Sequence, residues 1–447
     1  MRHNGRPIYW LISATFFLSL LSVLNGSPLV FPDTGTYILQ AAKMRGVIDR
    51  PPYYSIFLLG LHWKITLWTI PLAQNAIVSY VLFRFLRLEF ATLRDVEIFL
   101  IVVATGLLSY LPWASNEIMP DIFAPLILLV VYILAFRWER ITVLERVMLP
   151  PALAGMIAFH QANTVLAFGF LAIALVFCAF RRAPLVAIKR TTVLIAVPIA
   201  LAVGAQSLYG YLVIGRITPS PWGPFFLLAR VIYDGPGKTY LEEACPAKGY
   251  YLCNHLDDLD ATSDEFLWGN HSTLGAMIHV LKEQRALDEA NRIVAGTLRT
   301  HFFAEFGAGL KNWGLQLVRF GTADQSCPCL DGRVNDTVKE IFPGEYPAYA
   351  NSLQNRGAWP LTAISLVDRT AVILGLVALL ALFPRAEKNS RQCVLYLCGG
   401  IVLNAAVMGA LAGPADRYQA RMIWIIPMCA MATVLSQRAI RRRKPEA

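Results

Sequence analysis

Residues able to do chemistry lie in short polar stretches between long apolar runs of this 447-residue chain. The first stretch, residues 31–40, places Asp33 just beyond an apolar run and Tyr37 one helical turn later. A carboxylate in water against a membrane surface can take a proton from an acceptor hydroxyl. Asp33 can equally cap a helix that extends to Met44, and the two roles are compatible. Asp33 is the candidate catalytic residue, and Tyr37 is a candidate substrate-binding residue.

The second polar stretch reads Arg50-Pro51-Pro52-Tyr53-Tyr54. Two consecutive prolines block a helix and set an extended turn before the next apolar run. Arg50 can hold a phosphate through two parallel hydrogen bonds. Alternatively, its alkyl stem lies in the membrane interface while its charge stays in water. Arg50 and Tyr53 are both candidate substrate-binding residues.

The third polar stretch, residues 115–121, carries Glu117 and Asp121 on either side of Pro120. The two carboxylates can orient a substrate or bind a divalent cation, although no metal-ligand set is assigned and the cofactors stay undetermined. In the alternative interpretation Asp121 caps the next helix, because Pro120 is typical of a helix start. Further on, His160 marks a tight turn between two apolar runs. Glu117, Asp121 and His160 join the candidate substrate-binding residues.

The last polar stretch, residues 413–421, places Arg417 and Arg421 at the entrance of an apolar run. Guanidinium groups in this position suit an anionic headgroup or a diphosphate. The alternative is an ion pair between Asp416 and Arg421 on the surface, which would contribute little stability. Arg417 and its neighbour Tyr418 are therefore candidate substrate-binding residues.

The elements that position these residues follow from composition. Hydrophobic residues make up 56% of the chain, charged residues only 16%, and the mean hydropathy is +0.50. Soluble proteins carry about 25% charged residues. The net charge of +10 does not indicate nucleic-acid binding, because the basic residues punctuate the apolar runs instead of forming one patch. The sequence predicts an all-α polytopic membrane protein.

Hydropathy predicts about ten helical spans. They cover residues 8–30, 66–83, 97–113, 120–136, 147–161, 163–180, 191–213, 361–383, 393–412 and 421–437. Half of the 40 Lys and Arg residues fall on every second connection between these spans. Because basic connections stay in the cytoplasm, both termini are predicted to be cytoplasmic in the inner (plasma) membrane. The polar stretches described above then share the periplasmic or extracellular face.

The span pattern divides the chain into three regions. Residues 1–213 hold spans one to seven with the candidate catalytic loops, and residues 361–447 hold spans eight to ten. Residues 214–360 form a mostly helical extracytoplasmic segment, long enough to be a domain of its own.

Half of the chain's eight cysteines, namely Cys245, Cys253, Cys327 and Cys329, lie in the segment 214–360. An oxidising compartment favours disulfides there, and a four-thiolate zinc site is the alternative. A bond between Cys327 and Cys329 is disfavoured, because one intervening proline holds them near the limit of disulfide reach. We therefore expect Cys245 and Cys253 each to pair with Cys327 or Cys329, joining the start of the segment to its end.

Taken in order, the four polar stretches resemble the GT-C class of integral-membrane glycosyltransferases, which includes protein O-mannosyltransferases and the transferase that adds aminoarabinose to lipid A. The similarity rests on an acidic residue after the first span, an Arg-Pro-Pro-x-Tyr-like stretch, a short acidic loop between the third and fourth spans, and an Arg-Tyr pair before a last span that contains proline. In this sequence these are Asp33 with Tyr37, residues 50–54, residues 117–121, and Arg417-Tyr418 with Pro427.

The sequence also departs from that class. Asp33 is single where many members carry an acidic pair, and Ser55 stands where a proline-like residue often follows the Arg-Pro-Pro-x-Tyr core. The segment 214–360 has no counterpart that identifies an acceptor.

The resemblance implies a polyprenyl-phosphate-linked sugar donor and transfer of the sugar, usually with inversion, to an acceptor hydroxyl on the outer face. Asp33 would deprotonate the acceptor, and Arg417, with Arg50, would stabilise the charge on the departing phosphate. The implied partners are the lipid bilayer, this donor, and a glycan, lipid or protein acceptor. Three other functions are compatible with the sequence, namely a transporter or flippase for a lipid-linked sugar, a membrane ligase or polymerase of glycans, and a non-catalytic assembly scaffold.

Overall fold

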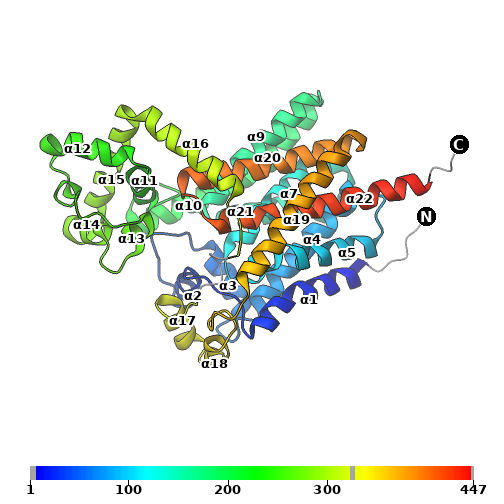
Figure 1. Ribbon diagram of the computed structural model, residues 1–447, viewed down its shortest axis with the longest axis horizontal. Coiled ribbons are helices and arrows are strands. Elements are labelled where there is room, and N and C mark those ends of the chain that lie inside the picture. The colour runs from blue at the N-terminus through cyan, green and yellow to red at the C-terminus, as the bar shows by residue number, and fades with distance from the viewer. Residues whose placement is uncertain (1–6, 323–327, 444–447) are drawn as a thin grey trace.

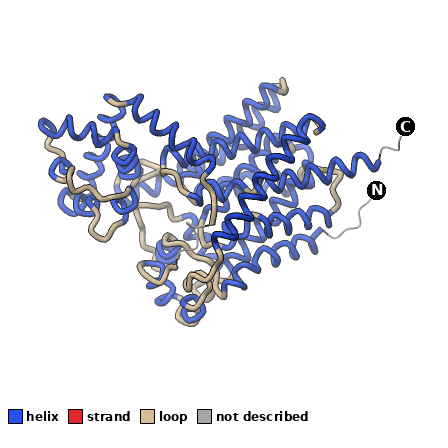
Figure 2. Tube along the Cα trace, in the orientation of Figure 1, coloured by secondary structure: helices blue, strands red, loops and turns tan. Residues whose placement is uncertain are grey.

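The computed structural model describes residues 7–322 and 328–443. Within these ranges the secondary structure is helical, apart from one isolated β-bridge between Leu29 and Glu117. The expected all-α fold class is confirmed (Figure 2).

The helices follow one another in a simple order. The first part of the chain forms α1 (Pro7–Asn25), α2 (Thr34–Ala42), α3 (Tyr53–His62), α4 (Thr69–Glu89), α5 (Asp95–Leu108), α6 (Leu111–Asn116), η1 (Pro120–Ile122), α7 (Phe123–Phe136), η2 (Trp138–Arg140), α8 (Val143–Ala158), α9 (Gln161–Phe180) and α10 (Leu185–Ile214). The middle forms α11 (Gly223–Asp234), α12 (Pro236–Lys248), η3 (Tyr251–Asn254), α13 (Ser263–Trp268), α14 (Thr273–Leu281), α15 (Glu283–Thr300), α16 (Phe302–Val318), α17 (Arg333–Ile341) and α18 (Tyr346–Ala350). The last part forms α19 (Leu361–Leu382), η5 (Phe383–Arg385), α20 (Lys388–Leu411), α21 (Asp416–Ile423) and α22 (Ile425–Arg443).

Seven helical stretches in the described ranges are long and apolar enough to cross a membrane, by length and composition. They are Ile8–Asn25, Thr69–Glu89, Gln161–Phe180, Leu185–Ile214, Leu361–Arg385, Lys388–Leu411 and Asp416–Ile440. The other three predicted spans are helices of only 14, 14 and 16 residues, namely α5, α7 and α8. A span needs about 20 residues, so the predicted number of about ten is not confirmed. Almost every residue of α7 is buried among its neighbours, which explains its uninterrupted hydrophobicity.

The long helices form one bundle whose two ends differ. Helix α1 begins and α22 ends at the same end of the bundle, here called the terminal end (Figure 1). Ion pairs join the Arg-rich connections at this end, for example Arg137 with Glu89 and Arg84 with Glu145. The opposite end, here called the site end, carries α2, α3 and the helices of the segment 214–360. Within the described residues, Arg190 of α10 pairs with Glu139 on the connection after α7, and Arg181 at the end of α9 donates to Asn389 at the start of α20, so these predicted basic connections lie together.

The segment 214–360 divides into structurally distinct parts. Helices α11 to α15 enclose a hydrophobic core of their own, which includes Phe225, Leu241 and Leu287. Helix α16 then returns to the bundle and packs along α20, where the indole of Trp313 donates a hydrogen bond to the Val402 carbonyl, 3.2 Å away. Helix α17 belongs to the core of the bundle.

Helix α17 lies unusually close to α2. A Cβ atom at Gly35 would stand 2.6 Å from the Val334 Cα atom, so a side chain at this position would force the helices apart. An ion pair of 2.8 Å between Lys43 and Glu340 adds a second contact. The segment 214–360 thus supports the helix that begins beside Asp33.

The predicted cysteine pairing is wrong. Cys245 and Cys253 form a disulfide with each other, with their Cα atoms 5.3 Å apart. Helix α12 ends at Lys248 and is followed by Gly249, whose φ of +60° reverses the chain and returns Cys253 to the helix end. Cys327 lies outside the described residues, and Cys329 is buried against the bundle core. The disulfide therefore closes a short loop and does not join the two ends of the segment.

Candidate active site

Asp33 faces a guanidinium group and not a helix end. It precedes α2 but its side chain forms no capping hydrogen bond, so the capping interpretation is wrong. Its two carboxylate oxygens instead accept hydrogen bonds from the two Nη atoms of Arg50, at 2.8 and 3.0 Å. Such a bidentate pair fixes the orientation of the carboxylate. The Asp33 side chain stays 29% exposed and can still be reached from outside.

The loop that carries Arg50 is fastened to α10. The Tyr209 hydroxyl donates to the Val47 carbonyl at 2.6 Å and accepts hydrogen bonds from the Val47 amide and the Gln40 side chain. The prolines after Arg50 then delay the next helix until Tyr53. Arg50 is held further by Asp49, at 2.9 Å, and lies over the ring of Tyr37, 5.1 Å from its centroid.

The electrostatic surroundings keep Asp33 ionised. Burial alone raises the pKa of Asp33, but the charge and hydrogen bonds of Arg50, with further contributions from Arg417 and His160, lower it below its usual value. The carboxylate is therefore negatively charged at neutral pH and ready to accept a hydrogen bond from a hydroxyl.

Asp121 forms the second acid–arginine pair, with Arg421. The two atoms are 2.9 Å apart, and both side chains are buried, at 6% and 3% exposure. Arg421 also donates to the Asn404 side chain of α20 at 3.2 Å. Asp121 caps no helix through its side chain. The predicted alternative of an Asp416–Arg421 pair is also wrong, because Asp416 pairs with Arg319 instead, at 3.2 Å.

Arg417 forms no ion pair with a carboxylate in residues 7–322 and 328–443, unlike Arg50 and Arg421. Its guanidinium carbon lies 4.2 Å from the ring centroid of Phe31 and 4.9 Å from that of Tyr418. One nitrogen, Nη2, donates to the Tyr418 hydroxyl at 3.3 Å. The other, Nη1, is buried and forms no hydrogen bond within the part of the chain that the structure describes. Buried polar groups are normally satisfied, so this atom needs an external acceptor.

His160 lies in the turn between α8 and α9. Its Nδ1 atom accepts a hydrogen bond from the Ala162 amide at 3.1 Å. Burial lowers the pKa of His160 to about 4, and the nearby arginines reinforce this against the opposing charge of Asp121. The ring is therefore neutral at pH 7, and the proton resides on Nε2, which can donate to a ligand.

The remaining candidate residues, Tyr37, Tyr53 and Glu117, differ in their contacts. Tyr37 is fully buried and packs edge-on against Tyr54, with ring centroids 5.0 Å apart. Tyr53 points elsewhere, because its hydroxyl donates to the Ala205 carbonyl of α10. Glu117 is almost fully buried, and its backbone carbonyl accepts a hydrogen bond from Gln74 at 2.9 Å.

The divalent cation near Glu117 and Asp121 stays a prediction. Within residues 7–322 and 328–443, no group of three or more His, Cys, Asp or Glu side chains is arranged to hold a metal ion. The carboxylate of Asp121 is engaged by Arg421.

Three residues of the site were missed from the sequence, namely Phe31, Tyr54 and Asn404. Asn404 had a usable signal, because a polar side chain within an apolar span commonly faces a functional interior. Phe31 and Tyr54 are aromatic residues next to predicted ones and carry no separate signal.

The site unites residues from α2, α21 and the connections before α3, α7 and α9 at one end of the bundle. Comparison of the chain with protein-family models, with curated proteins and with solved structures finds no match. The function has to be argued from this geometry.

Proposed function

We propose that this protein is a GT-C-like glycosyltransferase that moves a sugar from a polyprenyl-phosphate-linked donor to an acceptor hydroxyl. The observation that carries the proposal is the buried Nη1 atom of Arg417, which forms no hydrogen bond within the described residues, in a cluster that also holds the ionised, accessible carboxylate of Asp33. The first needs an anionic ligand, and the second needs a proton donor. A sugar phosphate and an acceptor hydroxyl supply these two groups.

In the proposed reaction the acceptor oxygen attacks the anomeric carbon while its proton passes to Asp33. The bond between that carbon and the phosphate oxygen breaks, and the electron pair leaves with the polyprenyl phosphate. Arg417 stabilises the negative charge on this leaving group. Because Asp33 has a lowered pKa, it takes the proton as the new bond forms and not before. Neutral His160 donates a hydrogen bond to the sugar or to the phosphate.

Arg50 takes a different role from the one expected. Its Nε and both Nη atoms are engaged by Asp49 and Asp33. We therefore assign Arg50 to holding Asp33 in position, and Arg417 alone to the phosphate.

A reconstituted transfer assay tests this function. The purified protein in proteoliposomes receives a polyprenyl-phosphate-linked radiolabelled sugar together with total membrane lipids, glycans and proteins as acceptors. Transfer releases polyprenyl phosphate and places the label on an acceptor. Movement of labelled donor across the membrane without any transfer product would instead identify a transporter.

We also propose that the terminal end is cytoplasmic and the site end faces the periplasm or the cell exterior. The support is the gathering of the Arg-rich connections at the terminal end. Single cysteines at Lys248 or Lys339, both exposed at the site end, should react with a membrane-impermeant thiol reagent in intact cells. A cysteine at Arg182, on the connection between α9 and α10, should react only after the cells are opened. The reverse pattern would refute this orientation.

A further inference from the structure

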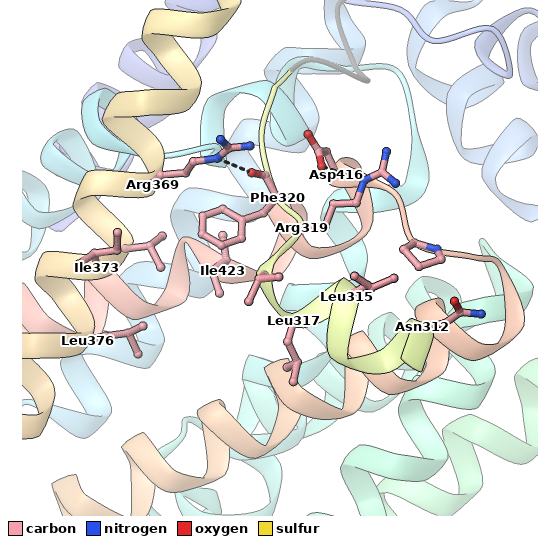
Figure 3. Close-up of a pocket in the computed structure, with 13 residues that line it drawn as sticks. Asn312, Leu315, Leu317, Arg319, Phe320, Arg369, Ile373, Leu376, Asp416 and Ile423 are labelled. Atoms are coloured by element: carbon pink, nitrogen blue, oxygen red, sulfur yellow. Dashed lines mark hydrogen bonds and ion pairs between the residues drawn. The ribbon is translucent and has the colours of Figure 1, made fainter. Parts of the chain in front are cut away.

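A groove of about 800 Å³ lies on the side of the bundle, between α16, α19 and α21 (Figure 3). Its volume is in the range of ligand-binding pockets. Much of its wall is apolar and includes Leu315, Leu317, Ile373, Leu376 and Ile423. Its mouth is polar and is lined by Arg319, Arg369 and Asp416.

The frame of the groove is fixed by hydrogen bonds on two sides. The Gln316 side chain exchanges two hydrogen bonds of 2.9 Å with the backbone of Ala415, which ties α16 to the start of α21. Residues 320–322 cross α19, where the Thr322 amide donates to Ser365 at 3.1 Å and Arg369 donates to the Phe320 carbonyl at 3.2 Å. The groove is therefore a preformed feature and not a gap between mobile segments.

The apolar wall is open toward the surface of a candidate membrane span. Ile373 and Leu376 on α19 are 59% and 39% exposed although they line the groove. Helix α19 belongs to one of the seven stretches that can cross a membrane. The groove can therefore admit a hydrocarbon chain directly from the bilayer.

The mouth carries more positive than negative charge. Arg319 and Arg369 both line it, and Asp416 pairs with Arg319. Arg369 forms no ion pair within the described residues and donates only to a backbone carbonyl. A Cβ atom at Gly321 would stand 3.0 Å from the Asp416 Oδ2 atom and 3.5 Å from the Arg369 Nη2 atom, so the glycine lets both side chains lie close to the backbone beside the mouth.

We propose that the groove binds an anionic membrane lipid, with a hydrocarbon chain along α19 and the phosphate at Arg369 and Arg319. Apolar walls that open to the bilayer below a cationic mouth match both halves of such a lipid. The site is separate from the donor site, because Arg417 contacts Phe31 and Tyr418 and does not line the groove. The lipid is therefore a second one, bound beside the first turn of α21.

Photochemical labelling tests this proposal without any transfer reaction. The protein is placed in phosphatidylcholine nanodiscs with phosphatidic acid that carries a diazirine on one acyl chain. The matched probe is diacylglycerol with the same diazirine chain and no phosphate. We expect phosphatidic acid to label the α19 peptide containing Ile373 and Leu376 at least about tenfold more than diacylglycerol, the difference that one charge-assisted hydrogen bond supplies.

Variants separate the groove from other surfaces. Arg369→Gln should lower phosphatidic acid labelling about tenfold, and Gly321→Leu should lower it by displacing the Arg369 and Asp416 side chains from the mouth. Arg417→Ala should leave it unchanged, because that residue belongs to the donor site. Leu374→Trp, at an exposed α19 position that does not line the groove, is the matched control for disturbance of the helix. Thermal unfolding in the nanodisc verifies that each variant is folded.

Several results would overturn the proposal. Equal labelling by the two probes, or undiminished labelling in folded Arg369→Gln, would show that α19 meets bulk lipid without recognising phosphate. Absence of labelling together with cross-links between two copies across α19 would assign the groove to a protein interface. Loss of labelling in Arg417→Ala would show that the groove and the donor site are one lipid-binding site. None of these results bears on the transfer assay, so the two proposals fail separately.

Discussion

The terminal end and the site end of the bundle both bring arginines and carboxylates together, but to different effect. At the terminal end, pairs such as Arg137 with Glu89 and Arg84 with Glu145 each join two helix ends. At the site end, Asp33 and Asp121 are held by Arg50 and Arg421, and Arg417 is left over with a buried nitrogen atom that forms no hydrogen bond within the described residues.

This difference separates charged residues that hold helices together from charged residues that are available to bind a ligand. A paired charge at a helix connection is neutralised by its partner and fixes which helices adjoin, although single atoms such as Arg137 Nε and Glu89 Oε1 also form no hydrogen bond within the described residues. A buried, unsatisfied guanidinium costs free energy in the folded protein, typically about 1–3 kcal/mol or more for a charged group. Such a group is expected where a ligand completes its hydrogen bonds. Substitutions at both ends of the bundle test whether their charges differ in function.

The largest effect is expected for Asp33→Asn. The substitution keeps the shape of the side chain and one hydrogen-bond acceptor, but an amide cannot take the proton of the acceptor hydroxyl. Transfer should fall about 100- to 10,000-fold, as for loss of a general base. The rate of release of polyprenyl phosphate measures it. If Asp33→Asn turns over at the parental rate, Asp33 is not the general base.

The matched control at the terminal end is Glu139→Gln. Glu139 is exposed and pairs with Arg190. Exposed ion pairs contribute about 0–1 kcal/mol, so both transfer rate and thermal stability should stay near the parental values. A loss of transfer comparable with that of Asp33→Asn would mean that the two ends are not functionally distinct.

Arg421→Ala should act mainly on stability. It leaves the buried Asp121 carboxylate without its partner, and breaking a buried pair in this way typically costs about 3–5 kcal/mol. Arg417→Ala should not lower the free energy of unfolding by a similar amount, because it removes a cation that has no carboxylate partner within the described residues. Thermal unfolding in nanodiscs compares the two variants. Equal destabilisation would show that Arg417 is structural.

Arg417→Ala should instead weaken the use of the donor. Loss of charge-assisted hydrogen bonds to a phosphate is expected to raise the apparent KM for the lipid-linked sugar about tenfold or more. Arg417→Lys should rescue only part of this, because an ammonium group lacks the planar fork of a guanidinium. Parental donor affinity in folded Arg417→Ala would exclude the phosphate role.

The smallest effect concerns pH. Arg50 lowers the pKa of Asp33 below the usual value of about 3.9, so the parental rate should be level from pH 8 down to about pH 5. His160, with a pKa of about 4, is neutral over this range and adds no inflection. In Arg50→Gln, burial is no longer opposed by this charge, so the pKa of Asp33 should rise. The fall in rate on the acid side of the pH profile should then occur closer to neutral pH. If it does not move, the ionisation of Asp33 does not control the rate.

Most of the long helices could be predicted from the sequence, because each hydrophobic run corresponds to one helix. All ten predicted runs are helical, although α5, α7 and α8 are short. The span number could not be settled in the same way, since a fully buried helix such as α7 and a lipid-facing one are equally apolar.

Which residues pair with one another in the site could not be predicted from the sequence. Asp121 and Arg421 are 300 positions apart, and only the packing of α7, α20 and α21 brings them together. The pairing of Asp33 with Arg50 depends on how the loop before Pro51 is fastened to α10. The disulfide was mispredicted for a local reason, the reversal of the chain at Gly249.

A density map of the protein in nanodiscs with bound polyprenyl phosphate would show whether Arg417 binds the donor phosphate. We expect phosphate density within hydrogen-bond distance of the Arg417 Nη1 atom, on the side of the cluster that faces Asp33. We also expect this density to be absent in Arg417→Ala. Polyprenyl phosphate bound only elsewhere on the bundle, with Arg417 Nη1 still unoccupied, would contradict the proposed donor site.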